Sequence, residues 1–415
     1  MYRRRVVDAE LSSRMRAAGA VLIEGPKACG KTATAQQVAT TTFRMDLDDG
    51  ARRLVGTAPE VLLAAAPPVL FDEWQETPRL WNLVRREVDD EPGVRGRYLL
   101  TGSATPDDDT RRHSGAGRYS YLRMRPMSLF ERGVSTGAVS LRDLFDGTLV
   151  PGLDPGVGVP QLVDQLVIGG WPDLLDATAR DAQQWLADYL RTVVEVDLPR
   201  LGVRRDPATL LRLLASLARG VGTQVTVQSL SKDVGGADGP LRRGTVADYL
   251  EALERLMLTE DLPAWGGHMR STTPLRKSPT RYMVDPSLGV AALGRGPEQL
   301  LHDMNATGFH FEAMVVRDLR IYAQPLGGHL SHWRDNNGHE VDVVVTLADG
   351  RWGALEVRMG PDSVDSAAAS LLRFQEKVDV ERLGAPVFLG VVTTRTAAYR
   401  RPDGVYVLPV AALGP

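Results

Sequence analysis

The sequence predicts an α/β fold at each end of the chain, with a mainly helical part between them. In the first part, short apolar strands alternate with amphipathic helices, and residues 150–161 then concentrate Pro and Gly. From residue 308 the chain returns to a helix followed by strands. Strands that alternate with helices are typical of a parallel sheet covered by helices. We therefore expect three domains, at residues 1–149, 161–300 and 301–415.

The composition is that of a globular protein. Of the 415 residues, 43% are hydrophobic and 24% charged, with a net charge of −3 at pH 7. No apolar run reaches the roughly 18–20 residues that span a bilayer, and no signal peptide is evident, so we expect no membrane partner. The single cysteine, Cys29, excludes an intramolecular disulfide and suits a reducing cytoplasm.

A phosphate-binding motif follows the first apolar strand, 21–23. The motif G-x-x-x-x-G-K-[ST] is complete, and its residues are Gly25, Pro26, Lys27, Ala28, Cys29, Gly30, Lys31 and Thr32. In a P-loop of this kind, backbone N–H groups surround the phosphates of ATP. Lys31 is expected to contact the β- and γ-phosphates, and the Thr32 hydroxyl is expected to ligate Mg²⁺. We interpret Cys29 as a filler position in the loop.

The next strands supply the remaining candidates for nucleotide chemistry. Strand 69–71 ends in Asp72 and Glu73, which fits a Walker B motif: Asp72 would hold Mg²⁺ through water, and Glu73 would polarise the attacking water. Strand 98–100 precedes Ser103, a candidate for sensing the γ-phosphate or an ordinary turn residue. Arg118 is a candidate arginine finger, often supplied by a neighbouring subunit, or else a solvated surface residue.

With these motifs, the chain resembles a broad prokaryotic family of AAA-type ATPases with a C-terminal domain of unknown function. The resemblance covers nearly the whole chain. It rests on "GPKACGKT", "LFDEWQ", "LLTGSA", "GRYSYLRMRPMSLFE", "IGGWPDLL", "DYLRTVVEVDL", "YMVDPSL", "FHFEAMVVRDL", "HEVDVVV" and "ALEVR". It implies an ATPase core, a winged-helix-like segment and a restriction-endonuclease-like fold at the end.

The middle part is compatible with a helix-turn-helix. Its last helix has an apolar face at helical spacing, formed by Val246, Tyr249, Leu250, Leu253 and Leu256. Arg242 and Arg243 stand where a recognition helix approaches DNA, but the outer face carries Asp248, Glu251 and Glu254, which would repel phosphates. A structural or protein-contact role is the alternative.

The terminal domain presents its polar residues in the order of a metal-dependent nuclease: Glu312, Asp342, Glu356 and Arg358. The carboxylates could ligate a second divalent cation. Arg358 stands where a lysine is expected, and a guanidinium cannot act as a base. The alternative is an arginine–carboxylate network that holds the sheet together.

We therefore expect a cytoplasmic Mg²⁺-dependent ATPase that couples ATP binding and hydrolysis to DNA or a protein. The sequence is compatible with an oligomer but does not determine the oligomeric state. The alternatives are an ATP-regulated nuclease and a nucleotide-switched interaction scaffold. ATP and Mg²⁺ are the expected cofactors.

Overall fold

The computed structural model describes residues 2–102, 114–148, 156–200, 206–236, 239–266, 278–360, 363–394 and 397–415. By contacts the chain divides into two compact units. Unit 1 comprises Met1–Pro126 with Ala252–Leu258, and unit 2 comprises Met127–Glu251 with Thr259–Pro415. We describe each unit by itself.

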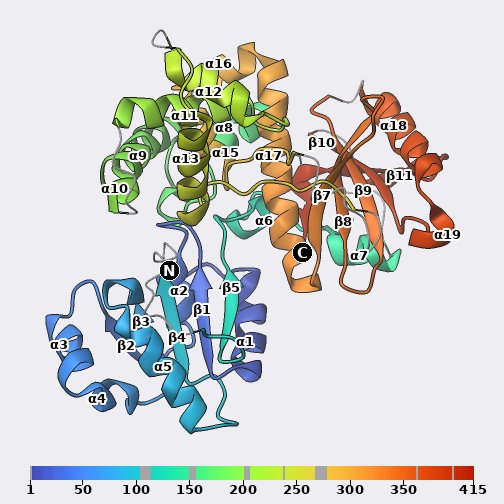
Figure 1. Ribbon diagram of the computed structural model, residues 1–415. Coiled ribbons are helices and arrows are strands. Elements are labelled where there is room, and N and C mark those ends of the chain that lie inside the picture. The colour runs from blue at the N-terminus through green and yellow to red at the C-terminus, as the bar shows by residue number, and fades with distance from the viewer. Residues whose placement is uncertain are drawn as a thin grey trace. The chain divides into compact units, whose positions relative to one another are not determined.

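Unit 1 is built on a five-stranded sheet in the order β2-β3-β4-β1-β5, in which every pairing is parallel (Figure 1). The predicted α/β class with a parallel sheet is confirmed. The strands are β1 Ala20–Glu24, β2 Thr41–Arg44, β3 Val69–Asp72, β4 Tyr98–Gly102 and β5 Tyr119–Arg123. The helices are α1 Val7–Ala17, α2 Lys31–Gln36, α3 Asp49–Thr57, α4 Pro59–Leu63 and α5 Arg79–Asp90, with a short 3₁₀ turn at Trp74–Glu76.

Both faces of this sheet are buried, which explains the uninterrupted apolar strands. Successive side chains of a strand point to opposite faces. Val21 and Ile23 of β1 accordingly join a core cluster with α1 and α2, while Ala20 and Leu22 join a second cluster with α3, α4 and α5. The polar residues at the carboxyl ends of the strands are thereby held on a rigid support.

Unit 2 begins with a short helix and turn region and continues as a group of helices. These elements are α6 Leu129–Arg132, β6 Val139–Ser140, α7 Leu141–Asp146, α8 Val159–Ile168, α9 Ala179–Thr192, a π-helical turn Val193–Asp197, α10 Leu198–Arg200, α11 Pro207–Arg219, α12 Val227–Gly235, α13 Arg243–Arg255, α15 Pro286–Ala292 and α16 Pro297–His302. After α13, which crosses the division between the units, isolated antiparallel bridges pair Thr259 with Met283 and Leu262 with Thr280.

The C-terminal part of unit 2 is a mixed sheet in the order β11-β12-β10-β9-β8-β7. Its strands are β7 His329–Arg334, β8 Glu340–Thr346, β9 Trp352–Val357, β10 Leu389–Thr393, β11 Tyr399–Arg400 and β12 Tyr406–Pro409, and β13 Leu413–Gly414 follows. α18 Val364–Lys377 packs on β8, β9 and β10, and α19 is Val380–Leu383. The long helix α17, Met304–Ala323, lies between this sheet and the helical group (Figure 1).

The structure places the first domain boundary earlier than the expected residue 149. Residues 127–148 pack with the end of the chain: β6 pairs with β13, and the Ser135 and Ser140 hydroxyls donate to the carbonyls of Leu413 and Pro415. The physical reason is that Leu129, Leu141, Leu144 and Phe145 are apolar and buried within unit 2.

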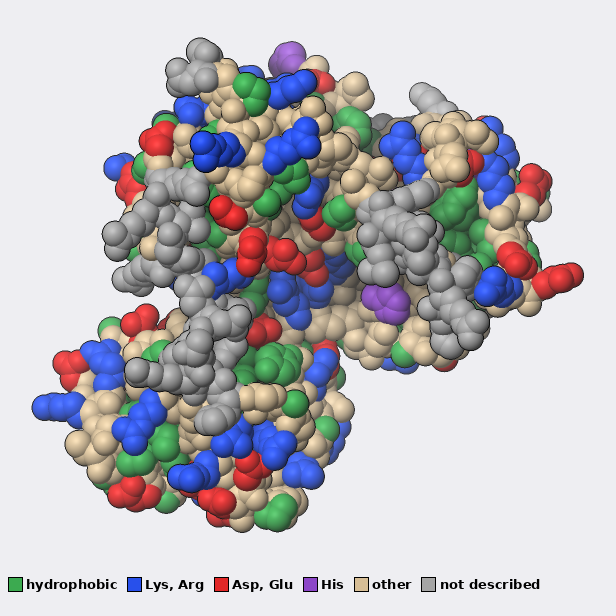
Figure 2. Space-filling view, viewed as in Figure 1, with side chains coloured by type: hydrophobic (Ala, Val, Ile, Leu, Met, Phe, Trp, Pro, Cys, Tyr) green, Lys and Arg blue, Asp and Glu red, His purple; other side chains and the backbone are tan. Residues whose placement is uncertain are grey.

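The visible surface carries basic and acidic side chains that are interspersed over both units (Figure 2). Among the described helices, none is both long enough and apolar enough to cross a membrane.

Candidate nucleotide site and C-terminal carboxylate cluster

The P-loop joins the carboxyl end of β1 to α2, as the sequence predicts. Ala28 and Gly30 have positive φ angles of 61° and 98°, so the backbone curls between the strand and the helix. Such left-handed turns aim successive N–H groups into a concavity that binds anions. Gly25 has to be glycine, because a Cβ there would lie 2.3 Å from the carbonyl oxygen of Met124.

Lys31 lies inside the loop. Its side chain is buried, and Nζ donates to the carbonyl oxygens of Gly25 at 3.0 Å and Pro26 at 2.9 Å. Both of these partners are backbone carbonyl oxygens of the loop itself. The loop thus combines a fixed cation with a curled backbone, which is the donor set that a triphosphate requires.

One carboxylate oxygen of Asp72 accepts hydrogen bonds from two hydroxyl groups. Thr32 Oγ1 donates to Asp72 Oδ1 at 2.7 Å, and Thr101 Oγ1 donates to the same oxygen at 2.5 Å. The sheet order explains this contact, since β4 lies between β1 and β3 and pairs Thr101 with Asp72. The two expected Mg²⁺ ligands, Thr32 and Asp72, are therefore in direct contact, and hydroxyl and carboxylate oxygens suit this cation.

Glu73 follows Asp72 in the left-handed region, with a φ of 53°. That conformation costs a non-glycine residue about 1–2 kcal/mol, and such strain often accompanies a functional role. Gln75 Nε2 donates to the Glu73 carboxylate and so fixes its direction. The turn packs tightly on β4, because a Cβ at Gly102 would lie 2.8 Å from Gln75 Oε1.

Two residues near this site were not singled out from the sequence. Thr101 precedes the expected Ser103 by two positions, and Ser103 itself lies outside the described residues. Arg5 is buried and donates from Nη1 to the carbonyl of Cys29 at 2.9 Å and from Nη2 to that of Arg125 at 2.8 Å. Arg5 thus ties the P-loop to the segment after β5. The signal in the sequence was an arginine directly before the apolar pair Val6-Val7.

Arg118 lies at the opposite edge of the sheet from the P-loop of its own chain. It precedes β5, whose first residue pairs with Ala20, the first residue of β1, whereas the P-loop follows the last residue of β1. A five-residue strand separates the two edges by about 16 Å. Arg118 Nε donates to Asp89 Oδ1 at 2.6 Å, and its side chain is 42% exposed.

Cys29 is fully buried in the core cluster between the sheet and α1. This environment is consistent with its interpretation as a filler position.

The C-terminal residues form a second polar cluster, in unit 2. Arg358 Nη1 donates to Asp342 Oδ2 at 2.8 Å, and Nη2 donates to Glu356 Oε2 at 2.5 Å. The guanidinium thus binds Asp342 and Glu356, two of the three carboxylates that were expected to ligate a cation. Among the described residues, no group of three or more His, Cys, Asp or Glu side chains is arranged to hold a metal ion. The observed arrangement is the arginine–carboxylate network that the sequence left as the alternative.

Within this cluster Glu356 is fully buried, whereas the Arg358 side chain is 35% exposed, and burial raises the pKa values of the glutamates. Burial, and then the charge of Asp342, raise the pKa of Glu356 to about 9. The same two causes, in the same order, raise the pKa of Glu312 well above its usual value. Glu312 accepts a hydrogen bond from the Tyr282 hydroxyl, and it lines a cavity of about 230 Å³ together with Asp342. With a pKa of about 9, Glu356 is protonated at pH 7, and a protonated carboxyl group is a poor ligand for a divalent cation.

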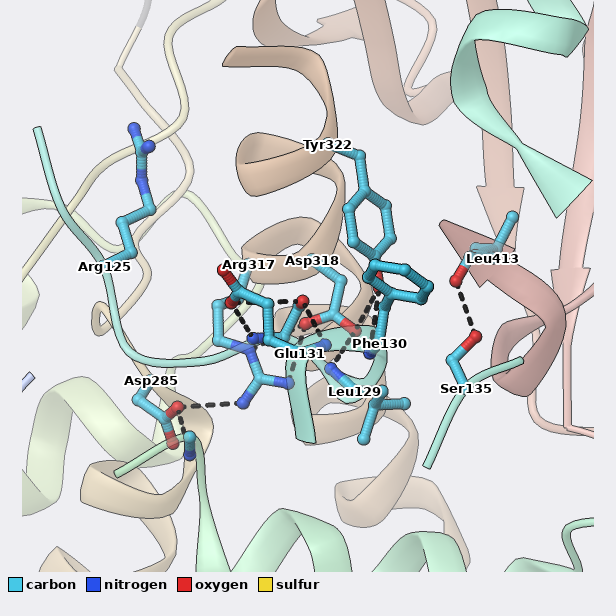
Figure 3. A network of polar contacts seen from close by, with 12 residues as sticks. Arg125, Leu129, Phe130, Glu131, Ser135, Asp285, Arg317, Asp318, Tyr322 and Leu413 are labelled. Atoms are coloured by element: carbon cyan, nitrogen blue, oxygen red, sulfur yellow. Dashed lines mark hydrogen bonds and ion pairs between the residues drawn. The ribbon is translucent and has the colours of Figure 1, made fainter. Parts of the chain in front are cut away.

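Several motifs outside unit 1 meet in one buried network on α17 (Figure 3). Arg317 Nη1 donates to Asp285 Oδ2 at 2.8 Å, and Nε donates to Asp318 Oδ1, also at 2.8 Å. Asp318 Oδ2 accepts from the backbone N–H of Leu129, and Asp285 Oδ2 accepts from that of Gly170. The stretches "MSLFE", "IGGWP", "VDPSL" and "VVRDL" therefore share a structural role.

Three family models match successive parts of the chain. Residues 17–132 match the family described as "AAA domain", and residues 159–299 and 307–413 match two families described only as domains of unknown function, DUF8612 and DUF4143. Uncharacterized proteins of Mycobacterium tuberculosis and Mycobacterium bovis are each 27% identical over 380 residues, which is 90% of this chain and 78% of theirs.

Among solved structures, a Walker-type ATPase of Pyrococcus abyssi aligns with a TM-score of 0.43 and 12% identity, over 70% of this chain and 96% of that one. From the AAA match, the parallel sheet and the P-loop geometry together, the N-terminal part is an AAA-type P-loop domain.

Proposed function

We propose that the chain is a cytoplasmic Mg²⁺-dependent ATPase that couples ATP binding and hydrolysis to a DNA or protein partner through its C-terminal domains. The observation that carries this proposal is the shared contact at Asp72. One carboxylate oxygen accepts from Thr32 of the P-loop and from Thr101 of β4, within the same loop-and-strand arrangement that holds Lys31.

Each side chain then has a role in phosphoryl transfer. Lys31 and the curled backbone bind the phosphates, and Thr32 with Asp72 holds Mg²⁺, directly or through water. Bound Mg²⁺ would neutralise charge on the phosphate oxygens. Glu73, held by Gln75, accepts a proton from the attacking water or orients it.

The test compares two variants of the full chain. Lys31→Ala removes the charge that holds the phosphates and should abolish tight ATP binding. Glu73→Gln should still bind ATP, while kcat falls by about 10²–10⁴ because general-base assistance is lost. Equilibrium binding and phosphate release, each with and without DNA, measure the two effects.

Gln37→Ala, at the exposed end of α2, is the matched control and should leave both quantities unchanged. Near-wild-type turnover of Glu73→Gln would remove the role proposed for Glu73. Tight ATP binding with negligible turnover in the wild type would favour the nucleotide-switched scaffold instead.

We infer that the C-terminal domains bind a partner and that the last domain does not cleave DNA efficiently. α11, α12 and α13 with the following bridges support a winged-helix-like module, and Arg242 and Arg243 are exposed where α13 begins. The helix-and-strand order from α17 to β10 supports a restriction-endonuclease-like fold. Against cleavage stands Arg358, which forms ion pairs with Asp342 and Glu356, two of the three carboxylates of the nuclease-like cluster.

Plasmid and linear DNA incubated with Mn²⁺ test this inference. We expect wild type to cleave at or near background, and we expect Arg358→Lys to gain activity only if the carboxylates can still take up a metal ion. Asp342→Ala is the control without the metal-binding carboxylate. Robust wild-type cleavage that disappears in Asp342→Ala would establish the alternative of an ATP-regulated nuclease.

A further inference from the structure

A second cavity lies within unit 2, far in sequence from the P-loop. Its volume is about 800 Å³, and it is lined by the end of α11, the end of α15, α16 and the start of α17. Cavities of about 300–1,000 Å³ are the usual size for small-molecule ligands. None of the nucleotide or nuclease-like residues described above contributes to its lining.

One wall of this cavity is apolar and presents an aromatic ring. Val221, Leu293 and Leu300 line it, together with Phe309, whose side chain is 39% exposed. An exposed aromatic ring at the edge of a cavity gives a flat ligand ring a surface on which to stack. The wall therefore favours a ligand with an aromatic part.

The polar groups of the lining are of the kind that read the edge of a nucleobase. Gln299 and Asn305 both line the cavity. Gln299 Oε1 already accepts from the backbone N–H of Gly296 at 2.9 Å, so Gln299 has its Nε2 donor to offer, whereas the Asn305 carboxamide can donate and accept at once. His310 also lines it; this side chain is only 2% exposed, and its Nδ1 has no hydrogen-bond partner within the described part of the chain. Burial lowers the pKa of His310 to about 4, so the ring is neutral at pH 7.

Because Nδ1 is itself buried, His310 contributes ring surface, and not a hydrogen bond, to the lining of the cavity.

The charges of the lining are balanced. Arg219 and Arg295 contribute two positive charges, and neither guanidinium forms an ion pair or hydrogen bond with another described residue. Glu298 and Asp303 contribute two negative charges, but Asp303 already caps α17 by accepting from the N–H of Ala306 at 3.0 Å. A balanced lining does not favour a simple anion such as inorganic phosphate. A ligand with an anionic group at one end and donors at the other fits better.

We propose that this cavity binds a nucleotide, with the base against Phe309, the base edge toward Gln299 and Asn305, and the phosphate toward the two arginines. The same chemistry is offered by a free mononucleotide and by an unstacked nucleotide of a single strand. The proposal does not depend on the P-loop.

The test uses the full chain carrying Lys31→Ala, so that binding at the P-loop is removed. Calorimetry with AMP and with CMP, and anisotropy with a short fluorescein-labelled single strand, measure binding. We expect saturable binding of at least one of these probes, and an affinity lowered about tenfold by Phe309→Ala and about tenfold by Arg295→Ala. Phe309→Trp, which keeps an aromatic ring, should bind as the parent does.

Leu211→Ala and Arg334→Ala replace exposed residues outside this cavity and are the matched controls. Mononucleotide binding that competes with the strand identifies the free nucleotide as a ligand, whereas binding of the strand alone identifies an unstacked nucleotide. Inorganic phosphate should compete with neither. The proposal is overturned if no probe binds saturably, or if Phe309→Ala and Arg295→Ala bind as tightly as the parent.

Discussion

Asp72 is the residue that joins the P-loop to β4 in the proposed nucleotide site, through hydrogen bonds from both. Its carboxylate is buried, and one of its oxygens accepts from both Thr32 and Thr101. Hydrogen bonds to a charged group are worth about 1.5–3 kcal/mol each. A carboxylate with two such bonds on one oxygen keeps a single orientation, so its other oxygen faces a fixed direction.

Thr101→Val should therefore weaken the use of Mg²⁺ without changing the shape of the core. The substitution removes the hydroxyl donor and keeps the volume, so the orientation of Asp72 depends more heavily on Thr32. We expect the Mg²⁺ concentration for half-maximal ATPase activity to rise about tenfold, with a smaller loss of rate at saturating Mg²⁺. Thr101→Ser restores the hydroxyl and is the control. An unchanged Mg²⁺ titration in Thr101→Val would mean that Thr32 alone orients the carboxylate.

The same residue shows how far the site could be predicted from the sequence. The sequence predicts a strand over 98–100, and β4 extends to Gly102. Ser103, the residue expected there, lies outside the described residues, and the residue opposite Asp72 is Thr101, which the register between β3 and β4 determines. Strand ends depend on pairing with neighbouring strands, which local sequence does not contain.

At the scale of elements, α17 is the helix that contacts both the helical group and the C-terminal sheet of unit 2. Arg317 is 2% exposed and lies between Asp285 and Asp318, which in turn hold the backbone of Gly170 and Leu129. The backbone at Leu129 and the backbone at Gly170 are thus both connected to the Arg317 guanidinium, each through one aspartate more than a hundred residues away in sequence. Sequence periodicity predicted the helix, but not its partners, because burial of a charged residue is decided by the tertiary structure.

Arg317→Met should destabilise unit 2 by about 3–5 kcal/mol, since it leaves two buried carboxylates without their counter-charge. Hydrogen exchange of the α17 amides measures this decrease in the free energy of unfolding. A local measurement is needed because the two units need not unfold together. Arg334→Met, which breaks an exposed pair with Glu340, should cost at most about 1 kcal/mol. Adding Asp285→Asn and Asp318→Asn to Arg317→Met should recover part of the protection. Unchanged exchange in Arg317→Met would show that apolar packing alone holds α17.

At the scale of the whole molecule, the position of Arg118 decides how it could act. It lies at the amino edge of the sheet, whereas the P-loop lies at the carboxyl edge. The sequence contained this information, because a residue that precedes a parallel strand lies at the edge opposite to one that follows it. An arginine finger at this place could reach only the nucleotide of a neighbouring chain.

If Arg118 acts in this way, ATPase activity per chain should rise with protein concentration. Arg118→Ala should lower kcat by a factor on the order of 10³, the usual effect of losing such a group. Mixing Arg118→Ala chains with Lys31→Ala chains should restore some activity, because an intact P-loop can then meet an intact Arg118. Arg85→Ala is the matched control, since Arg85 pairs with the same Asp89 at 2.9 Å from within α5, and its turnover should stay within about twofold of the wild type. Turnover that is independent of concentration, with no rescue on mixing, would leave Arg118 as a surface residue whose role is its ion pair with Asp89.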